Sequence, residues 1–191
     1  MRTLPIILAT LALSGTVAAV EKSEKKAAAP KLAAAPAAPK PAPEVDRLKY
    51  FVGSWHCEGI DFASPLGPEH PMVETVTAKT DLDDFWVIQR VTEKKTKENQ
   101  NPLDGIYAWT YDPGQKKFVA TWNDNTGGWA TQSSKGWEGD KLVFLGEYAS
   151  GSRKMAARDT YTKKSDQELV HSFEIKSKHG WKKVDEETCK K

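Results

Sequence analysis

The sequence predicts an all-β fold, a closed up-and-down antiparallel barrel of about ten strands preceded by a short N-terminal helical turn. From residue 45 onward, short segments of alternating apolar and polar residues are separated by turn residues, which is typical of a barrel or sandwich. No amphipathic helix of roughly ten to fifteen residues follows, although parallel strands would need such crossovers. One cysteine lies near each end of this region, as expected of a sheet closed on itself.

Residues 1–19 have the pattern of a secretory signal peptide. Arg2 supplies a positive start, residues 4–13 are apolar, and Val17-Ala18-Ala19 forms a small-residue cleavage site. We expect cleavage after Ala19 and a periplasmic or secreted protein. A retained membrane anchor is the alternative, but the apolar stretch is short against the roughly 20 residues of a span. No transmembrane segment is then expected in the remaining chain.

Residues 20–44 predict a disordered linker rich in alanine, proline and lysine. Residues 21–44 contain nine Ala, five Pro and five Lys, and no aromatic side chain. Such a segment buries too little apolar area to offset the entropy of ordering, and its prolines interrupt any helix. We expect a spacer. A basic tether to an anionic surface is the alternative.

Residues 45–191 are expected to form one barrel domain. All 18 aromatic residues lie at or beyond Tyr50, so a core can form only in this part of the chain. Arg2 and the linker together carry a charge of +3, so the net charge of +2 leaves residues 45–191 at −1. A nucleic-acid-binding domain is usually clustered and strongly basic, so no nucleic-acid partner is expected.

A helical turn is predicted at residues 45–52, with Leu48, Phe51 and Val52 on one face that plugs an end of the barrel. Gly53 ends the turn. Ten strands follow, connected by turns such as the Pro-Gly turn at residues 112–115. Their approximate ranges are 54–61, 71–81, 85–95, 104–112, 116–124, 128–136, 141–148, 152–163, 168–177 and 180–189.

The two cysteines, Cys57 and Cys189, are predicted to form a disulfide. With an even number of up-and-down strands, the first and last strands are antiparallel neighbours, and these residues lie at the start of one and the end of the other. An exported protein with two cysteines most simply pairs them. Two buried free thiols are the alternative.

Alternation along the strands also suggests side chains for a ligand cavity. Leu169, His171 and Phe173 share one face of their strand, and Arg90 shares a face with Trp86. The alternatives are that these aromatic residues simply fill the barrel and that Arg90 pairs with an acid at its mouth. The candidate ligand-binding residues are Trp86, Arg90, Trp122, Phe144, His171 and Phe173.

The run Gly53-Ser54-Trp55 after an apolar turn resembles the opening of lipocalin-like (calycin) barrels, where the indole packs across the barrel floor. Trp55 is therefore the expected floor residue. Further segments resemble DUF1579, an exported bacterial family of unknown function; they are 105–113 (GIYAWTYDP), 118–124 (FVATWND) and 136–142 (GWEGDKL). The resemblance covers most of residues 46–191. It implies a barrel with a ligand cavity and brings no established reaction.

A more distant resemblance is to nitrobindins, ten-strand haem barrels that open with a Gly-x-Trp-x-Gly-x-Gly run. Gly53, Trp55 and Gly59 match this run, and Cys57 departs from it. The iron of that family is held by a histidine late in the chain. The resemblance makes His171 the candidate haem ligand here; the alternative is a histidine satisfied by hydrogen bonds.

No catalytic constellation is recognised, since a Gly-x-Ser-x-Gly elbow is absent and the histidines show no metal-ligand spacing. No metal is expected: His56 should point outward, His70 lies in a loop and His179 in a turn. We expect an exported, non-enzymatic barrel without a cofactor that binds a small apolar or amphipathic molecule. A haem protein acting on reactive nitrogen species and an envelope-associated scaffold domain are the alternatives.

Overall fold

The computed structural model describes residues 37–191. The expected signal peptide and most of the expected linker lie outside these residues. Residues 37–42 have no regular secondary structure, and the first element begins at Pro43. No helix within residues 37–191 combines the length and apolarity that a membrane span needs.

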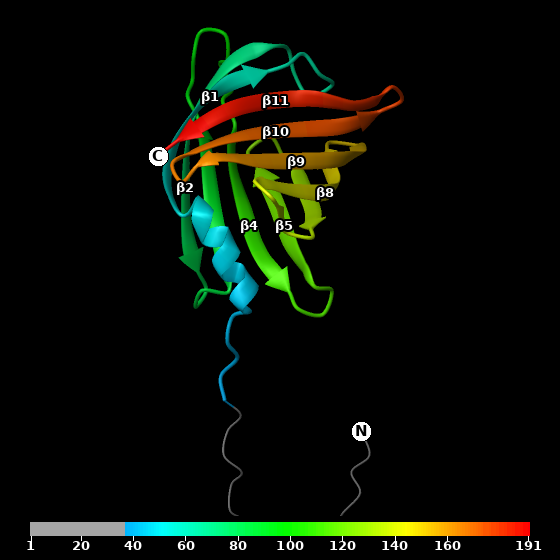
Figure 1. The fold of residues 1–191 in the computed structure, drawn as a ribbon. Helices are drawn as coiled ribbons and strands as arrows, with labels where there is room; N and C mark the ends of the chain where they lie inside the picture. Colours follow the sequence, from blue (N-terminus) through cyan, green and yellow to red (C-terminus); the bar gives the residue numbers. More distant parts are fainter. Residues whose placement is uncertain (1–36) are drawn as a thin grey trace, which may run out of the picture. The chain divides into compact units, whose positions relative to one another are not determined.

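Ten long antiparallel strands form a closed barrel (Figure 1). Consecutive strands pair with one another, β6 pairs with β8, and β11 returns to β1 and closes the sheet. The two-residue β7 adds only a short pairing beside β8. The predicted fold class is confirmed. The strands are β1 Gly53–Asp61, β2 His70–Asp81, β3 Trp86–Glu93, β4 Asp104–Asp112, β5 Lys117–Asp124, β6 Trp129–Ser134, β7 Trp137–Glu138, β8 Lys141–Ser150, β9 Arg153–Ser165, β10 Glu168–Ser177 and β11 Gly180–Lys190.

The N-terminal helical turn is a 3₁₀ helix, η1, at Pro43–Phe51. Its buried side chains, Val45, Leu48 and Phe51, recur every third residue. This spacing matches the three residues per turn of a 3₁₀ helix, which aligns them in one row. The row packs against β2, β3 and β4. The prediction placed Val52 on this face, but Val45 lies there and Val52 follows the helix.

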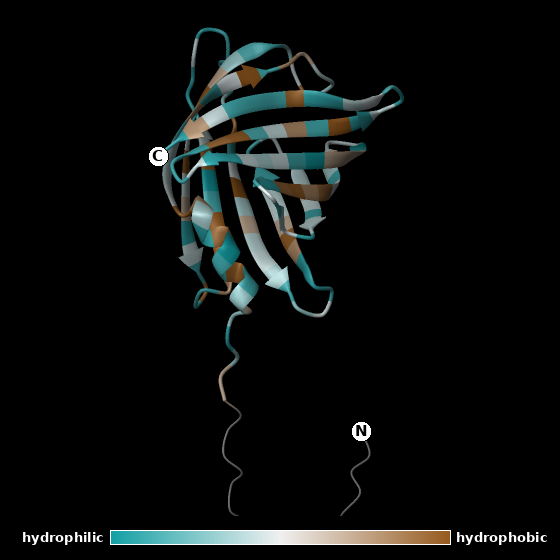
Figure 2. Ribbon diagram, viewed as in Figure 1, coloured by the Kyte–Doolittle hydropathy of each residue, from teal (hydrophilic) through white to brown (hydrophobic). Residues whose placement is uncertain are grey.

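The barrel is solid at the end that η1 covers. Phe51 meets Trp109 edge to face with ring centroids 4.7 Å apart, and Trp109 stacks on Phe144 at 5.9 Å. These rings are almost completely buried, together with Leu48 and Leu142. We call this apolar end, which η1 covers, the floor. Elsewhere along the strands, apolar bands alternate with hydrophilic ones (Figure 2).

The predicted disulfide is confirmed. Cys57 on β1 faces Cys189 on β11 in register, and the two sulfur atoms are bonded across 132 residues of sequence. Both residues are buried. The bond joins the two strands that close the sheet, so it links the beginning of the barrel to its end.

Candidate functional site

A cavity of about 660 Å³ occupies the part of the barrel above the floor. Phe51 and Trp55 lie at its bottom, and the loops after β1, β3 and β5 line its rim. These loops leave the strand ends that lie opposite η1, because η1 leads directly into the start of β1. We call this open end the mouth.

The cavity lining is acidic. It includes the two histidines His70 and His171 but no lysine or arginine among the described residues. Eight carboxylate residues line it, contributed by six strands and one loop: Asp61, Glu74, Glu93, Glu98, Asp124, Asp159, Asp185 and Glu187. Glu74, Glu93, Asp159 and Glu187 are buried.

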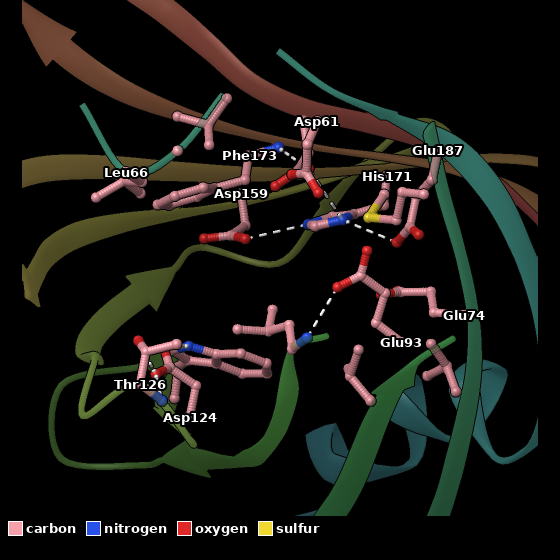
Figure 3. A pocket seen from close by; sticks show the side chains of 18 of the residues that line it. Asp61, Leu66, Glu74, Glu93, Asp124, Thr126, Asp159, His171, Phe173 and Glu187 are labelled. Carbon is pink, nitrogen blue, oxygen red and sulfur yellow. Dashed lines mark hydrogen bonds and ion pairs between the residues drawn. The ribbon is translucent and has the colours of Figure 1, made fainter. Parts of the chain in front are cut away.

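His171 on β10 lies between two of these carboxylates (Figure 3). Its Nε2 is 3.1 Å from Asp159 Oδ1, and its Nδ1 is 3.2 Å from Glu187 Oε1. The imidazole also stacks on the Tyr161 ring at a centroid distance of 4.5 Å. Burial alone would lower the pKa of His171, but the hydrogen bonds to Asp159 and Glu187 raise it well above its usual value. Both ring nitrogens thus lie at hydrogen-bond distance from a carboxylate oxygen, an arrangement that favours the protonated ring.

Asp159 is the centre of a wider hydrogen-bond network. Tyr107 donates its hydroxyl to Asp159 Oδ1 over 2.9 Å, and the Gln132 side chain donates to Oδ2. With His171, three side chains from three strands thus meet one carboxylate that is 1% exposed. A buried carboxylate with this many donors is held in one orientation.

Other carboxyls of the cavity hold their protons more tightly than in water. Burial and the neighbouring charge of Glu187 raise the pKa of Glu74 well above its usual value. Burial also raises the pKa of Asp185, although the positive charge of His171 opposes the shift. The pKa of Asp61 rises to about 6, chiefly through burial. Like charges gathered in a poorly solvated space account for these shifts.

Three buried oxygen atoms of the lining have no hydrogen-bond donor. They are Oε1 of Gln89, Oε1 of Glu93 and Oε2 of Glu187. A buried acceptor without a donor costs roughly 1–3 kcal/mol. These atoms are therefore positioned to accept hydrogen bonds from, or to bind, a cationic group in the cavity.

Aromatic rings line the same space, among them Trp55, Tyr107, Trp122, Tyr148, Tyr161 and Phe173. The indole of Trp122 donates to Asp124 Oδ2 over 2.9 Å, so an acid holds this ring in place. Trp122 also lies directly against Gly105 of β4, where an added Cβ would come within 2.0 Å of the indole. A glycine is needed there for the ring to occupy its position.

Comparison with known proteins identifies the family. The profile of a protein family of unknown function, DUF1579, matches residues 40–191. The chain belongs to this family. A similar solved structure is the crystal structure of Rv2717c from M. tuberculosis, with a TM-score of 0.62, 13% sequence identity, and 80% of this chain and 99% of that chain covered. At this identity the likeness concerns the fold alone. No curated protein matches the chain.

Some of the predicted site residues line the cavity of this DUF1579 barrel, and others do not. Trp122, His171 and Phe173 line it. Trp55 lies at its bottom and donates its indole N–H to the Phe51 carbonyl over 2.8 Å, which holds the start of β1 against η1. Phe144 is buried in the floor below the cavity.

Trp86 and Arg90 require a correction, because they lie on the outer face of β3. Val87, Gln89 and Val91 are the buried residues of this strand, so the alternating positions point outward. The Arg90 side chain is 52% exposed and pairs with Asp104 at 2.7 Å. The alternative prediction paired Arg90 with an acid at the mouth, and Arg90 does pair with an acid, Asp104, on the outer face of the barrel.

Sequence reasoning missed the acidic residues of the cavity. One signal was present: Glu187 lies two residues before Cys189, and β11 places both side chains inside. Likewise, Glu74 pairs with Cys57 across β1 and β2. The disulfide indicates that the cysteine side chains point into the barrel. Because side chains two residues apart in a strand lie on the same face, Glu187 is then expected to point into the barrel as well.

The surroundings of His171 in this DUF1579 barrel do not fit a haem ligand. An iron ligand needs a nitrogen lone pair that is free to bind the metal, whereas both ring nitrogens lie within 3.2 Å of carboxylate oxygens.

Proposed function

We propose that this barrel binds a small amphipathic organic cation, an amine with an apolar body. The observation that carries the proposal is the cavity of about 660 Å³ lined by eight carboxylate residues and by no described lysine or arginine. An ammonium group would bring positive charge and N–H donors to a lining in which carboxylates outnumber the two histidines. Gln89 Oε1 and Glu187 Oε2 are acceptors available for it.

The aromatic lining supports the same ligand class. Cations are attracted to the faces of tryptophan and tyrosine rings, and aromatic cages are a recurrent way to bind ammonium groups. The volume lies within the range of about 300–1,000 Å³ found for small-molecule sites. An anionic amphipath such as a fatty acid would face the carboxylates without a described lysine or arginine to meet it.

A matched series of ligands tests this proposal. We expect 4-phenylbutylamine to bind the full chain in calorimetric titrations, 4-phenylbutanol to bind more weakly and 4-phenylbutyrate not to bind. The three share an apolar body and differ in charge. Equal affinity for all three, or a preference for the carboxylate, would overturn the proposal.

Variants of single carboxylates locate the binding site. Glu187→Gln removes one charge at the unpartnered acceptor, so we expect weaker binding of the amine. Glu147→Gln is the control, since Glu147 pairs with Lys154 on the exterior and its side chain is 48% exposed. Equal loss of affinity in both variants would point to nonspecific attraction instead of the cavity.

Export is a further part of the proposal. Disulfides such as Cys57–Cys189 form and persist in oxidising compartments, which supports a periplasmic or secreted location. Fractionation of cells that express the full chain, or the chain without residues 1–19, tests this point. We expect only the full chain outside the cytoplasm; equal distribution would contradict export.

A further inference from the structure

We propose that Asp61, His70 and Glu93 form a binding site for one divalent transition-metal ion at the mouth of the barrel. Each residue offers one ligand atom, and these atoms all lie within 4.8 Å of one another. The site is distinct from the His171 network and does not depend on the proposed amine ligand. Sequence spacing alone gave no such site, because the three residues are contributed by three strands.

The strand register brings the three residues together. Asp61 ends β1 and pairs directly with His70, which begins β2. Glu93 ends β3, the next strand of the sheet. All three residues therefore lie at the same end of neighbouring strands, and all three line the cavity.

Two atoms that bind one ion at about 2.0–2.2 Å lie roughly 3–4 Å apart. His70 Nε2 is 3.3 Å from Asp61 Oδ2, which fits this spacing. Glu93 Oε1 lies 3.8 Å from the other ring nitrogen, Nδ1, and one atom from each of the three residues lies within 4.8 Å of the other two. Small rotations of these side chains would bring the three groups around a common centre.

Glu93 supplies the observation that points to a missing cation. Its side chain is only 3% exposed, and Oε1 has no hydrogen-bond partner. An ion pair between His70 and Asp61 does not satisfy this oxygen, since the separation of 3.8 Å from Nδ1 exceeds hydrogen-bond length. A metal ion would satisfy it directly.

The groups around the site orient the ligands as metal sites usually require. Glu93 Oε2 accepts from the Asn99 side chain at 2.7 Å and from the Leu103 amide at 2.8 Å. This holds the carboxylate so that Oε1 remains free. His70 Nδ1 lies 3.2 Å from the Pro71 carbonyl, which can only accept. The proton is then on Nδ1, and the lone pair is on Nε2.

The ligand types indicate the metal. One imidazole and two carboxylates suit first-row transition ions such as Zn²⁺, Mn²⁺ or Fe²⁺, whereas Mg²⁺ and Ca²⁺ prefer oxygen ligands alone. Two carboxylates also balance the charge of a divalent ion. Three protein ligands leave at least one coordination position for water or for a molecule in the cavity.

Metal titration of the full chain tests the site. After treatment with a chelator, we expect one Zn²⁺ per chain by calorimetry, visible absorption bands on addition of Co²⁺, and much weaker binding of Mg²⁺. Failure of Zn²⁺ to bind the wild-type chain would overturn the proposal, as would equal affinity for Mg²⁺.

Two conservative variants and a matched control assign the ligands. We expect Glu93→Gln and His70→Gln each to weaken Zn²⁺ binding by roughly 100-fold or more, since changes in the outer partners of metal ligands alone cost about 10–100-fold. His56→Gln removes the exposed histidine that faces Glu58 on β1 and should leave binding unchanged. Thermal unfolding of each metal-free variant checks its fold. Unchanged Zn²⁺ affinity in either folded ligand variant, or equal loss in His56→Gln, would contradict the assignment.

Discussion

The floor and the mouth of the barrel use the same strands for opposite purposes. At the floor, the inward residues are apolar and include Phe51, Trp109 and Phe144 in mutual ring contact. At the mouth, they include buried carboxylates such as Glu187 and Glu93. Strand β3 contains both regions, since its inward residues run from Val87 through Gln89 to Glu93. Strand alternation therefore determines which side chains face inward. Whether an inward side chain is apolar or acidic depends on its height in the barrel.

The two regions should respond differently to change. Apolar packing at the floor stabilises the fold, because burial of apolar area is the main favourable contribution to folding. The mouth brings together like charges and buried acceptors without donors, and both raise the free energy of the folded state. Such destabilising groups commonly occur at functional sites. Four predictions follow this contrast, in order of decreasing effect.

Phe51→Ala should destabilise the floor most. The ring is 2% exposed and contacts Trp109, Trp137 and Tyr161. Truncation of such a ring costs about 3–5 kcal/mol through lost burial and the resulting cavity. Urea denaturation of the wild-type chain and the variant measures this loss. A loss below about 1 kcal/mol would mean that η1 is not a structural part of the floor.

Loss of the disulfide should lower stability by a similar or slightly smaller amount. Cys57 and Cys189 lie between the floor and the mouth, and the bond closes a loop of 132 residues in sequence. Removal of a native disulfide typically costs about 2–5 kcal/mol. We expect the double variant Cys57→Ser with Cys189→Ser to melt at a lower temperature than the wild-type chain in oxidising buffer. Identical melting temperatures would show that the bond adds no constraint.

The mouth should make the folded state less stable as the pH rises above about 5. The raised pKa values of Glu74, Asp185 and His171 mean that the folded state binds more protons than the unfolded chain in this range. Stability then falls with increasing pH, because the proton uptake that favours folding is lost. Chemical denaturation from pH 5 to 8 measures the slope. A free energy of unfolding that increases over this range would contradict the assignment of these shifts.

Glu74→Gln should produce the smallest change, a stabilisation of about 1 kcal/mol at pH 8. The substitution keeps the shape of the protonated carboxyl and removes its repulsion from Glu187. We also expect a flatter pH profile of stability. Denaturation curves at pH 5 and pH 8 check both effects, and destabilisation at pH 8 would show that the Glu74 charge is needed for folding.

Much of the fold was predictable from the sequence because local rules determine it. The strand ranges, the closed sheet and the Cys57–Cys189 bond follow from alternation, turn residues and the parity of an up-and-down barrel. Trp86 was assigned to the cavity as a large aromatic residue that could line a pocket, and Arg90 because it shares Trp86's face of the strand. In the structure the opposite face of β3, which includes the polar Gln89, points inward.

The candidate site was less predictable, because its residues come from distant strands. His171 and Phe173 could be found from the apolar alternation of β10, since they share a face with Leu169. The approach of Asp61, His70 and Glu93 depends on the register of β1, β2 and β3, which the spacing along the chain does not contain. The inward direction of the acids of β11 could not be predicted, because charged residues occur on both faces of this strand and hydropathy does not tell the faces apart.

Binding of 4-phenylbutylamine measured by calorimetry at pH 5.5 and pH 8 tests most directly whether the mouth is a site for organic cations. Carboxyls with raised pKa values, such as Glu74 and Asp185, must lose protons to meet an ammonium group. The account predicts tighter binding at pH 8, with protons released on binding, as shown by heats that depend on the ionisation enthalpy of the buffer. Affinity that is independent of pH, or stronger at pH 5.5, would contradict it.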